Sequence, residues 1–531
     1  LTGLATPEEL RAWTAAARRL QAGYGLSTEL MPRFLLLAVV LLFGAGSQDS
    51  GLVPQQPGRE GTTVRAEEAV LAGNRRAIRV EISRMRDRAP VAVRSGDRLL
   101  WSGQAGPGYT ELLVAAGPNE EVNLPVRVEV AGRVTFDGQL ALTPVRLREF
   151  RLLPHAHVDI GDAGPQPEVE RTQWRNLRDA VQLGLKTAGY PQAARFRWNV
   201  EGLWSVERYL AQASPADRDA FIDAVRNGTI GLQANYANLL TGLATPEELR
   251  AWTAAARRLQ AGYGLPPLRA VMQTGIPGLS WTVVAALAHA GVRYVSSGPD
   301  YRPGLPDGGD RIGQTLREMG DRSFWWISPS REERILFWMA GRGCSWFHGP
   351  VTGRDPDRTR DALLDYSREL VARAYPYDLV QVHCTIGGDN ASVDPTLPDF
   401  VRDWNDRFDT PKLAIDTTES LFAEFERRHG RDLPELAGDM TPYCEDGVLS
   451  TAADEARVRA AARRLAQAET LAALSGVSLS PASLDAAWSD ILLWHGHTWG
   501  SADRVRQPDP PDVVAPWEHT RAFAERADRR T

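Results

Sequence analysis

The chain is poor in cysteine, carries no excess of positive charge and has no hydrophobic run long enough to cross a bilayer. Its 531 residues include three cysteines, and they form no CxxC pair, so neither a disulfide framework nor a cysteine-based zinc site is indicated. The net charge of −6 gives no support for binding to nucleic acid or to an anionic membrane. The apolar run from Phe34 to Phe43 is about half the ~20 residues that a transmembrane helix requires.

What is present is a composition typical of a soluble globular protein. Hydrophobic residues make up 43% of the chain and charged residues 24%, and the length allows more than one domain. The chain has 16 tryptophans, which fit either core packing or the stacking of sugar rings on indoles. Composition alone leaves both roles open.

Residues 31–47, MPRFLLLAVVLLFGAGS, have the features of a secretory signal peptide. A basic residue precedes an apolar run, and small residues follow it. A polar segment rich in Gly, Pro and Gln comes next, and we assign 48–76 as a linker. The expected mature protein is secreted or periplasmic and has no membrane span.

A 26-residue string occurs twice, letter for letter, at 1–26 and at 240–265. The first copy precedes the signal peptide, so we expect the natural start to be Met31 and residues 1–30 to be extraneous. In the second copy Thr245 is a good helix N-cap, and Glu248 three residues later completes a capping box. The string therefore predicts a helix that ends at one of the glycines near 262–264.

The remainder of the chain divides into three parts. Short alternating runs separated by turn residues predict a small β-sandwich-like domain over 77–146. Strands alternating with helices over 147–445 predict an α/β domain, with its site at the carboxyl ends of parallel strands. Residues 446–531 read as helices, which we interpret as part of a helical bundle.

Two histidine motifs are candidate metal sites. PHAHVDIG contains His157 and Asp159, whose i, i+2 spacing would place both side chains on one face of a strand. Imidazole and carboxylate are zinc ligands, although a buried histidine and a surface aspartate would also explain the pair. LLWHGHTWGS contains His495 and His497 in an apolar run, where they would form either a ligand pair or a hydrogen-bonded structural pair.

Two carboxylates are candidates for catalysis or sugar binding. Asp389 follows a hydrophobic strand and two glycines in TIGGDN, where it would be either a general acid/base or part of a turn. Glu201 lies between Trp198 and Trp204 in RWNVEGLW. It would either bind sugar hydroxyls among these aromatics or be buried with a partner.

Taken in order, these segments resemble the catalytic region of glycoside hydrolase family 38, the zinc-dependent α-mannosidases. The resemblance covers residues 150–525 and rests on the segments HAHVDIG, FRWNVEGLW, VMQTGIPGLSW, PKLAIDTTESLFAEF, LPELAGDMTPYC and HGHTWG. It implies a barrel-like domain of seven parallel strands, followed by a three-helix bundle and by β domains that this chain lacks. We therefore expect a truncated chain whose ligand is a carbohydrate; the oligomeric state stays open.

The resemblance also implies roles for particular residues. His157, Asp159 and His497 correspond to ligands of Zn²⁺, and Asp389 corresponds to the general acid/base. The substrate-binding positions are Trp198, Glu201, Asn235, His495 and Trp499.

The sequence departs from this family where the nucleophile is expected. The matching segment, GLQANYANLLTG, has Asn235 and Tyr236 in place of the family's aspartate and contains no acid. Asp162 stands where a tryptophan usually follows the HxDxG motif. Three hypotheses follow: an α-mannosidase-like glycosidase with an atypical nucleophile, a zinc-dependent polysaccharide lyase with Tyr236 as base, and a non-catalytic carbohydrate-binding relative.

Overall fold

The computed structural model describes residues 61–160, 165–276, 278–299, 318–344, 355–386, 388–496 and 507–531. The predicted signal peptide and the first copy of the repeated string lie outside these residues. So do Asp162, His497 and Trp499. Within the described ranges, no helix combines the length and the apolar character that a membrane crossing requires.

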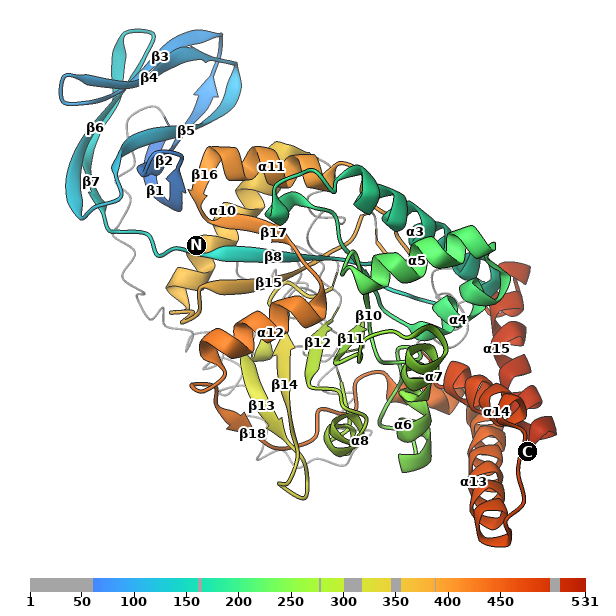
Figure 1. Ribbon diagram of the computed structural model, residues 1–531. Helices are drawn as coiled ribbons and strands as arrows, with labels where there is room; N and C mark the ends of the chain where they lie inside the picture. The colour runs from blue at the N-terminus through green and yellow to red at the C-terminus, as the bar shows by residue number, and fades with distance from the viewer. Residues whose placement is uncertain are drawn as a thin grey trace, which may run out of the picture. The chain divides into compact units, whose positions relative to one another are not determined.

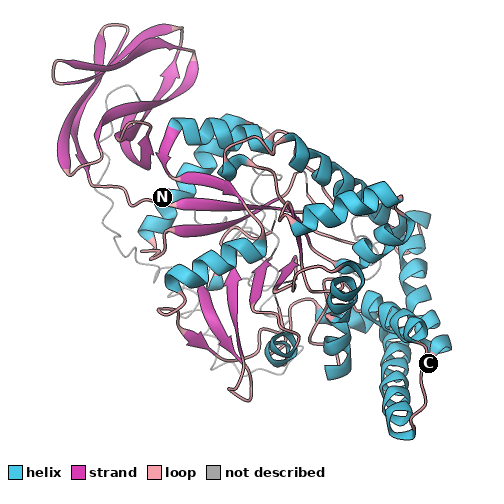
Figure 2. Ribbon diagram, viewed as in Figure 1, coloured by secondary structure: helices cyan, strands magenta, loops and turns pink. Residues whose placement is uncertain are grey.

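The N-terminal region is a β-sandwich of two antiparallel four-stranded sheets (Figure 2). The sheet orders are β16-β1-β2-β5 and β4-β3-β6-β7. Their facing sides share an apolar core that includes Val80 from one sheet and Val128 from the other. The strands of this region are β1 (Thr62–Leu71), β2 (Arg75–Met85), β3 (Ala89–Ser95), β4 (Arg98–Ala105), β5 (Gly108–Pro118), β6 (Val122–Val130) and β7 (Arg133–Leu142).

This domain begins earlier than predicted, because the expected linker 48–76 contains the whole of β1. The alternation of apolar and polar residues along β1 is interrupted in the sequence by Glu67, a charged residue that is nonetheless fully buried. The eighth strand comes from much later in the chain. β16 (Phe408–Thr410) pairs antiparallel with β1, with Val70 opposite Thr410. The sandwich is thus completed by the α/β region.

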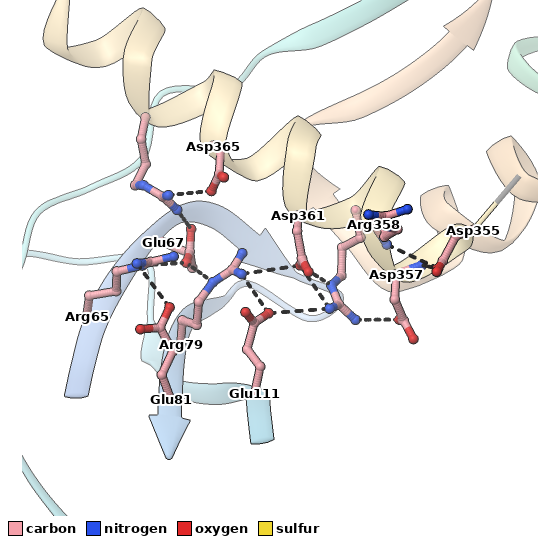
Figure 3. Close-up of polar contacts among 12 residues, drawn as sticks. Arg65, Glu67, Arg79, Glu81, Glu111, Asp355, Asp357, Arg358, Asp361 and Asp365 are labelled. Atoms are coloured by element: carbon pink, nitrogen blue, oxygen red, sulfur yellow. Dashed lines mark hydrogen bonds and ion pairs between the residues drawn. The ribbon is translucent and has the colours of Figure 1, made fainter. Parts of the chain in front are cut away.

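A buried ion network also connects the sandwich to helix α10 (Pro356–Ala372) of the α/β region (Figure 3). Arg79 on β2 pairs with Glu67, with Glu111 at 2.6 Å and with Asp361 of α10 at 3.3 Å. Arg368 of the same helix lies 2.6 Å from the second oxygen of Glu67. Breaking a buried ion pair leaves a charge without compensation, which is strongly destabilising. These contacts therefore hold α10 against the sandwich.

The α/β region contains three sheets in which parallel pairing predominates. Figure 1 shows β17, β8 and β15 side by side, and both of their pairings are parallel. β9 and β10 form a parallel pair, and the third sheet has the order β11-β12-β14-β13-β18. The strands are β8 (Glu149–Pro154), β9 (Trp198–Val200), β10 (Ile230–Leu232), β11 (Ala270–Thr274), β12 (Tyr294–Gly298), β13 (Ser323–Ile327), β14 (Arg334–Met339), β15 (Leu379–Cys384), β17 (Lys412–Ile415) and β18 (Glu435–Leu436).

The structure therefore gives a mixed α/β fold and does not show the single seven-stranded parallel barrel that we predicted. β13 and β14 form an antiparallel hairpin where a βα unit was expected. Isolated contacts at the strand ends connect neighbouring sheets, such as the parallel bridge between His155 and Asn199. Similarly, Ala234 N donates a 2.7 Å hydrogen bond to Ala270 O. The pair β9–β10 thus contacts the neighbouring sheets on both sides.

Helices surround these sheets, and capping residues mark the ends of several of them in the sequence. The predicted capping box is present: Thr245 accepts from the Glu248 main chain, and the Glu248 side chain accepts from Thr245. The expected single helix is interrupted at Thr253, and Gly264 ends it with a φ of 60°. The helices are α3 (Gln166–Lys186), α4 (Leu203–Gln212), α5 (Pro215–Arg226), α6 (Pro246–Trp252), α7 (Ala254–Tyr263), α8 (Val283–His289), α11 (Leu397–Arg407) and α12 (Thr418–His429).

The C-terminal region is helical, as predicted. It contains α13 (Ala452–Ser475), α14 (Pro481–Trp494) and α15 (Pro511–Arg530). Arg526 and Arg530 of α15 both pair with the buried Asp490 of α14. These ion pairs join two helices of the bundle.

Candidate active site

The segment after β8 carries the first predicted ligand pair. The strand ends at Pro154, so His157 and Asp159 lie in the following loop and do not alternate along a strand as predicted. Both side chains are nevertheless buried, at 1% and 4% exposure. His155 beside them is fully buried, and its Nδ1 lies 3.1 Å from Leu153 O, which assigns it a structural role.

Two residues orient the His157 ring. Its Nδ1 lies 2.7 Å from Thr274 Oγ1 and 3.3 Å from Glu201 Oε2. The Thr274 hydroxyl in turn donates to Glu201, so Nδ1–H of His157 donates to the threonine oxygen. This is the arrangement by which a carboxylate fixes the tautomer of a metal-binding histidine.

The space beside Nε2 of His157 depends on Gly275. This residue has a φ of +72°, and a Cβ at its position would lie 2.5 Å from His157 Nε2. A side chain would therefore be both strained and in collision with the imidazole. Glycine at this position avoids both effects.

Glu201 is an ionised, fully hydrogen-bonded carboxylate. Burial would raise its pKa, but the charge of His157 and the hydrogen bonds from His157 and Thr274 outweigh burial and lower the pKa to about 2. Its Oε2 also accepts a 2.6 Å hydrogen bond from Val158 N. These contacts orient His157 and correspond to the second alternative for Glu201, a carboxylate that is buried with a partner.

The GGDN loop after β15 meets the His157 segment directly. Asn390 N donates a 2.7 Å hydrogen bond to His157 O. The Asn390 amide group donates to Asp159 O at 2.6 Å and accepts from Asp159 N at 3.3 Å. Asp389, the predicted acid/base, precedes Asn390 in this loop and is exposed. The structure thus brings Asp389 and the two predicted ligands into one loop cluster.

The remaining predicted positions in the α/β region are buried among other side chains. Trp198 is 3% exposed and stacks on Phe196 in the apolar core, which leaves no ring face for a sugar. Asn235 is fully buried, and its Nδ2 donates to Glu201 O at 2.8 Å and to Met272 O at 3.3 Å. It thus connects the segment after β10 to the segment after β9 and to β11. Its amide oxygen has no partner among the described residues.

Tyr236 points toward the bundle. Its hydroxyl donates to Ser489 Oγ on α14 at 2.9 Å. Burial, assisted by the charge of Glu207, raises its pKa to about 12. A phenol with a raised pKa and a structural partner is a poor general base, so its surroundings count against the predicted base role.

His495 was predicted to touch substrate, but it is fully buried between two carboxylates. Nε2 lies 2.9 Å from Glu455 Oε2, and Nδ1 lies 2.9 Å from Glu248 Oε1. The second contact has the distance of an ion pair without the angles of a hydrogen bond. Burial would lower the pKa of His495, but the two glutamates outweigh burial and raise it to about 9. His495 therefore joins α6, α13 and α14.

The described residues include two of the three ligands that we predicted for zinc. Within the ranges listed above, no group of three or more His, Cys, Asp or Glu side chains is arranged to hold a metal. His157 and Asp159 offer one imidazole and one carboxylate, which suit zinc, and the third predicted ligand, His497, lies outside the described part. The donor types and the oriented imidazole fit zinc as far as they are described.

Sequence reasoning missed the residues that support this cluster, namely Thr274, Gly275 and Asn390. Thr274 and Gly275 lie in VMQTGIPG, within one of the segments that carry the resemblance. Glycine after a buried strand is a recognisable signal of close approach. Asn390 had a signal as well, because asparagine in a glycine-rich loop tolerates the positive φ of 52° that it adopts.

Comparison with known proteins shows likeness at the level of fold. No known family profile matches the sequence, and no curated protein matches it. An α-mannosidase from Enterococcus faecalis V583 superposes with a TM-score of 0.52 at 14% identity, covering 72% of this chain and 42% of that one. A glycosyl hydrolase family 38 protein from Enterococcus faecalis gives a TM-score of 0.47 at 13% identity, over 72% and 40% of the two chains.

A 4-α-glucanotransferase from Thermococcus litoralis gives a TM-score of 0.43 at 10% identity and covers 72% of this chain and 58% of its own. The chain therefore spans less than half the length of the two Enterococcus proteins. At these identities the likeness concerns the fold alone. The described part of the chain has a fold similar to that of a glycoside hydrolase.

Proposed function

We propose that this chain belongs to a zinc-dependent glycosidase of the α-mannosidase type. The observation that carries the proposal is the 2.7 Å hydrogen bond from Asn390 N to His157 O. It brings the loop of Asp389 against the segment of His157 and Asp159. Two predicted zinc ligands and a predicted acid/base, more than 200 residues apart in sequence, thus belong to one cluster.

In this proposal His157, Asp159 and His497 hold the zinc. The bound metal would supply Lewis-acid contacts to sugar hydroxyls. Glu201 and Thr274 hold the His157 ring, and glycine at 275 avoids a collision with that ring. Asp389 protonates the leaving oxygen, a role that its exposed position in the loop allows.

The attacking group stays open within this proposal. Residues 231–244 contain no acid, and Asn235 is not an ordinary nucleophile. The anomer of the first-formed product, observed by proton NMR, distinguishes attack by an enzyme nucleophile, which gives retention, from direct attack by water, which gives inversion. The buried Tyr236 hydroxyl argues against the lyase alternative. A carbohydrate-binding relative would bind zinc and sugar without turnover.

The test is metal content and turnover in the full-length protein. We expect about one zinc per chain by elemental analysis, lost in His157→Ala and kept in His289→Ala, whose side chain is 74% exposed. A wild-type chain without zinc after loading would rule out the proposal.

Turnover of aryl α-mannosides is the second readout, with uronate-containing glycans and ultraviolet detection for the lyase alternative. Asp389→Asn should lower turnover about 100-fold, as for a lost general acid. Asp432→Asn, at another exposed aspartate, is the matched control. Equal rates for the two variants would remove Asp389 from this role.

A further inference from the structure

Asn390 contacts the His157–Asp159 segment with three separate groups. Its main-chain N–H donates to His157 O at 2.7 Å. Its side-chain Nδ2 donates to Asp159 O at 2.6 Å, and its Oδ1 accepts from Asp159 N at 3.3 Å. The amide thus pairs with both main-chain groups of one residue, as a neighbouring strand would.

The residue type matches this task closely. Asn390 has a φ of 52°, in the left-handed region that asparagine adopts more readily than most residues. Aspartate has the same shape but lacks the N–H₂ donor, and glycine tolerates the φ but lacks both side-chain groups. Only an amide of this length supplies a donor and an acceptor together.

The loop is also held from the side of α3. Gln173 Nε2 donates to Asn390 Oδ1 at 3.3 Å, and Asn176 Nδ2 donates to Ala391 O at 2.8 Å. Both helix residues are buried, at 5% and 0% exposure. The loop therefore has a fixed support on one side, and its remaining contacts go to the predicted ligand segment.

We propose that Asn390 is a positioning residue that couples zinc binding at His157 and Asp159 to the placement of Asp389. This inference rests on the proposed function and deepens it. A metal bound by the two side chains restrains their main-chain groups, and Asn390 transmits that restraint to the residue before it. Coupling of this kind is reciprocal, so an ordered loop raises zinc affinity by the factor by which zinc orders the loop.

The test compares Asn390→Asp with Asn405→Asp in the full-length protein. Asn405 makes an equivalent clamp far from the cluster, with Nδ2 donating to Leu413 O at 2.8 Å and Oδ1 accepting from Leu413 N at 2.9 Å. Each substitution removes one amide donor from one main-chain pair. A purely structural role predicts that the two variants behave alike.

Zinc affinity is measured by competition with a chromophoric chelator. We expect Asn390→Asp to weaken zinc binding about 10- to 100-fold, the range for loss of a supporting contact behind a metal ligand, and Asn405→Asp to leave it unchanged. Asn390→Gly, which keeps the left-handed backbone, should also weaken it. Unchanged affinity in both Asn390 variants would overturn the coupling.

Hydrogen exchange of residues 386–391 is the second readout. In the wild type, zinc should slow exchange in this peptide, and in Asn390→Gly the effect of zinc should be lost. Absence of zinc binding by the wild type would overturn the proposed function together with this inference. Zinc binding that leaves the exchange of this loop unaltered would overturn the coupling alone.

Discussion

His495 and Glu455 form a buried ion pair in which Nε2 lies 2.9 Å from Oε2. The other ring nitrogen of His495 faces Glu248 at the same distance. Glu248 belongs to the second copy of the repeated string, and Glu455 belongs to the bundle. One imidazolium therefore connects the α/β region to the helices that follow it.

Acid should weaken this connection through Glu455. Burial would raise the pKa of Glu455, but the hydrogen bond and charge of His495, followed by the Trp494 N–H, lower it to about 2. A carboxylate with a lowered folded pKa stabilises the protein above its unfolded pKa, and this contribution is lost as the pH falls toward the folded value. Between pH 7 and 3, thermal midpoints of Glu455→Gln should fall less steeply than those of the wild type.

The control for this experiment is Glu469→Gln on the same helix. Glu469 pairs at 3.0 Å with Arg250, whose side chain is 61% exposed, and exposed pairs contribute little. This variant should follow the wild-type pH profile. Parallel profiles for all three proteins would contradict the buried-pair interpretation.

Removing the Glu248 carboxylate should lower the free energy of unfolding at neutral pH. Glu248→Ala leaves the buried His495 with one counter-charge and also deletes half of the capping box at Thr245. Breaking a buried pair costs about 3–5 kcal/mol, and we expect a loss of that order in urea unfolding. Glu247→Ala, at an exposed position in the same turn, should change stability little. Similar losses in both variants would point to helix propensity.

Gly275→Ala should damage the proposed zinc site beyond its effect on the backbone. The added Cβ would lie 2.5 Å from His157 Nε2. Gly291→Ala is the matched control, because its φ is +84° and nothing lies within 4 Å of a Cβ there. Both variants carry the strain of a left-handed alanine, about 1–2 kcal/mol. Only Gly275→Ala should lose zinc, as measured by elemental analysis; equal zinc content would show that the contact is relieved.

Tyr236→Phe should have a structural effect only. It removes one buried hydrogen bond to Ser489, which corresponds to about 0.5–1.5 kcal/mol. Ser489→Ala removes the same bond from the other side and should lower the thermal midpoint similarly. Turnover at saturating substrate should stay close to that of the wild type in both. A loss of turnover specific to Tyr236→Phe would restore the tyrosine as a catalytic base.

Deletion of residues 1–30 should leave the thermal midpoint and the zinc content unchanged. The partners of the repeated helix are already occupied by the second copy: Leu249 and Trp252 are 1% and 0% exposed. A fall in the midpoint after deletion would show that the first copy has a structural role.

The sequence predicted features whose cause is local. The capping box at Thr245 and the β strands between turn residues depend on neighbours in the chain, so their patterns were sufficient. The start of the sandwich was missed because Glu67 is buried against arginines from other elements. The sequence around Glu67 does not predict a partner that lies far away in the chain.

In the candidate site, too, the local motifs could be predicted and the contacts between distant segments could not. HAHVDIG and the GGDN loop were predicted as functional segments, but their contact depends on the pairing of β8 with β15, in which Pro154 lies opposite Cys384. For His495 the sequence left a ligand role and a structural role open, because its two glutamate partners come from other helices, α6 and α13. Whether a histidine binds a ligand or forms a structural ion pair depends on the distant segments that pack around it.

The strand β16 has a consequence for how the chain comes apart. It supplies an edge to the N-terminal sandwich although it lies more than 250 residues beyond β7 in sequence, and Arg148 N is bonded to Thr410 Oγ1 at 2.9 Å. A protease that nicks the connection between Leu142 and Glu149 would therefore yield two fragments that remain associated until denaturant separates them.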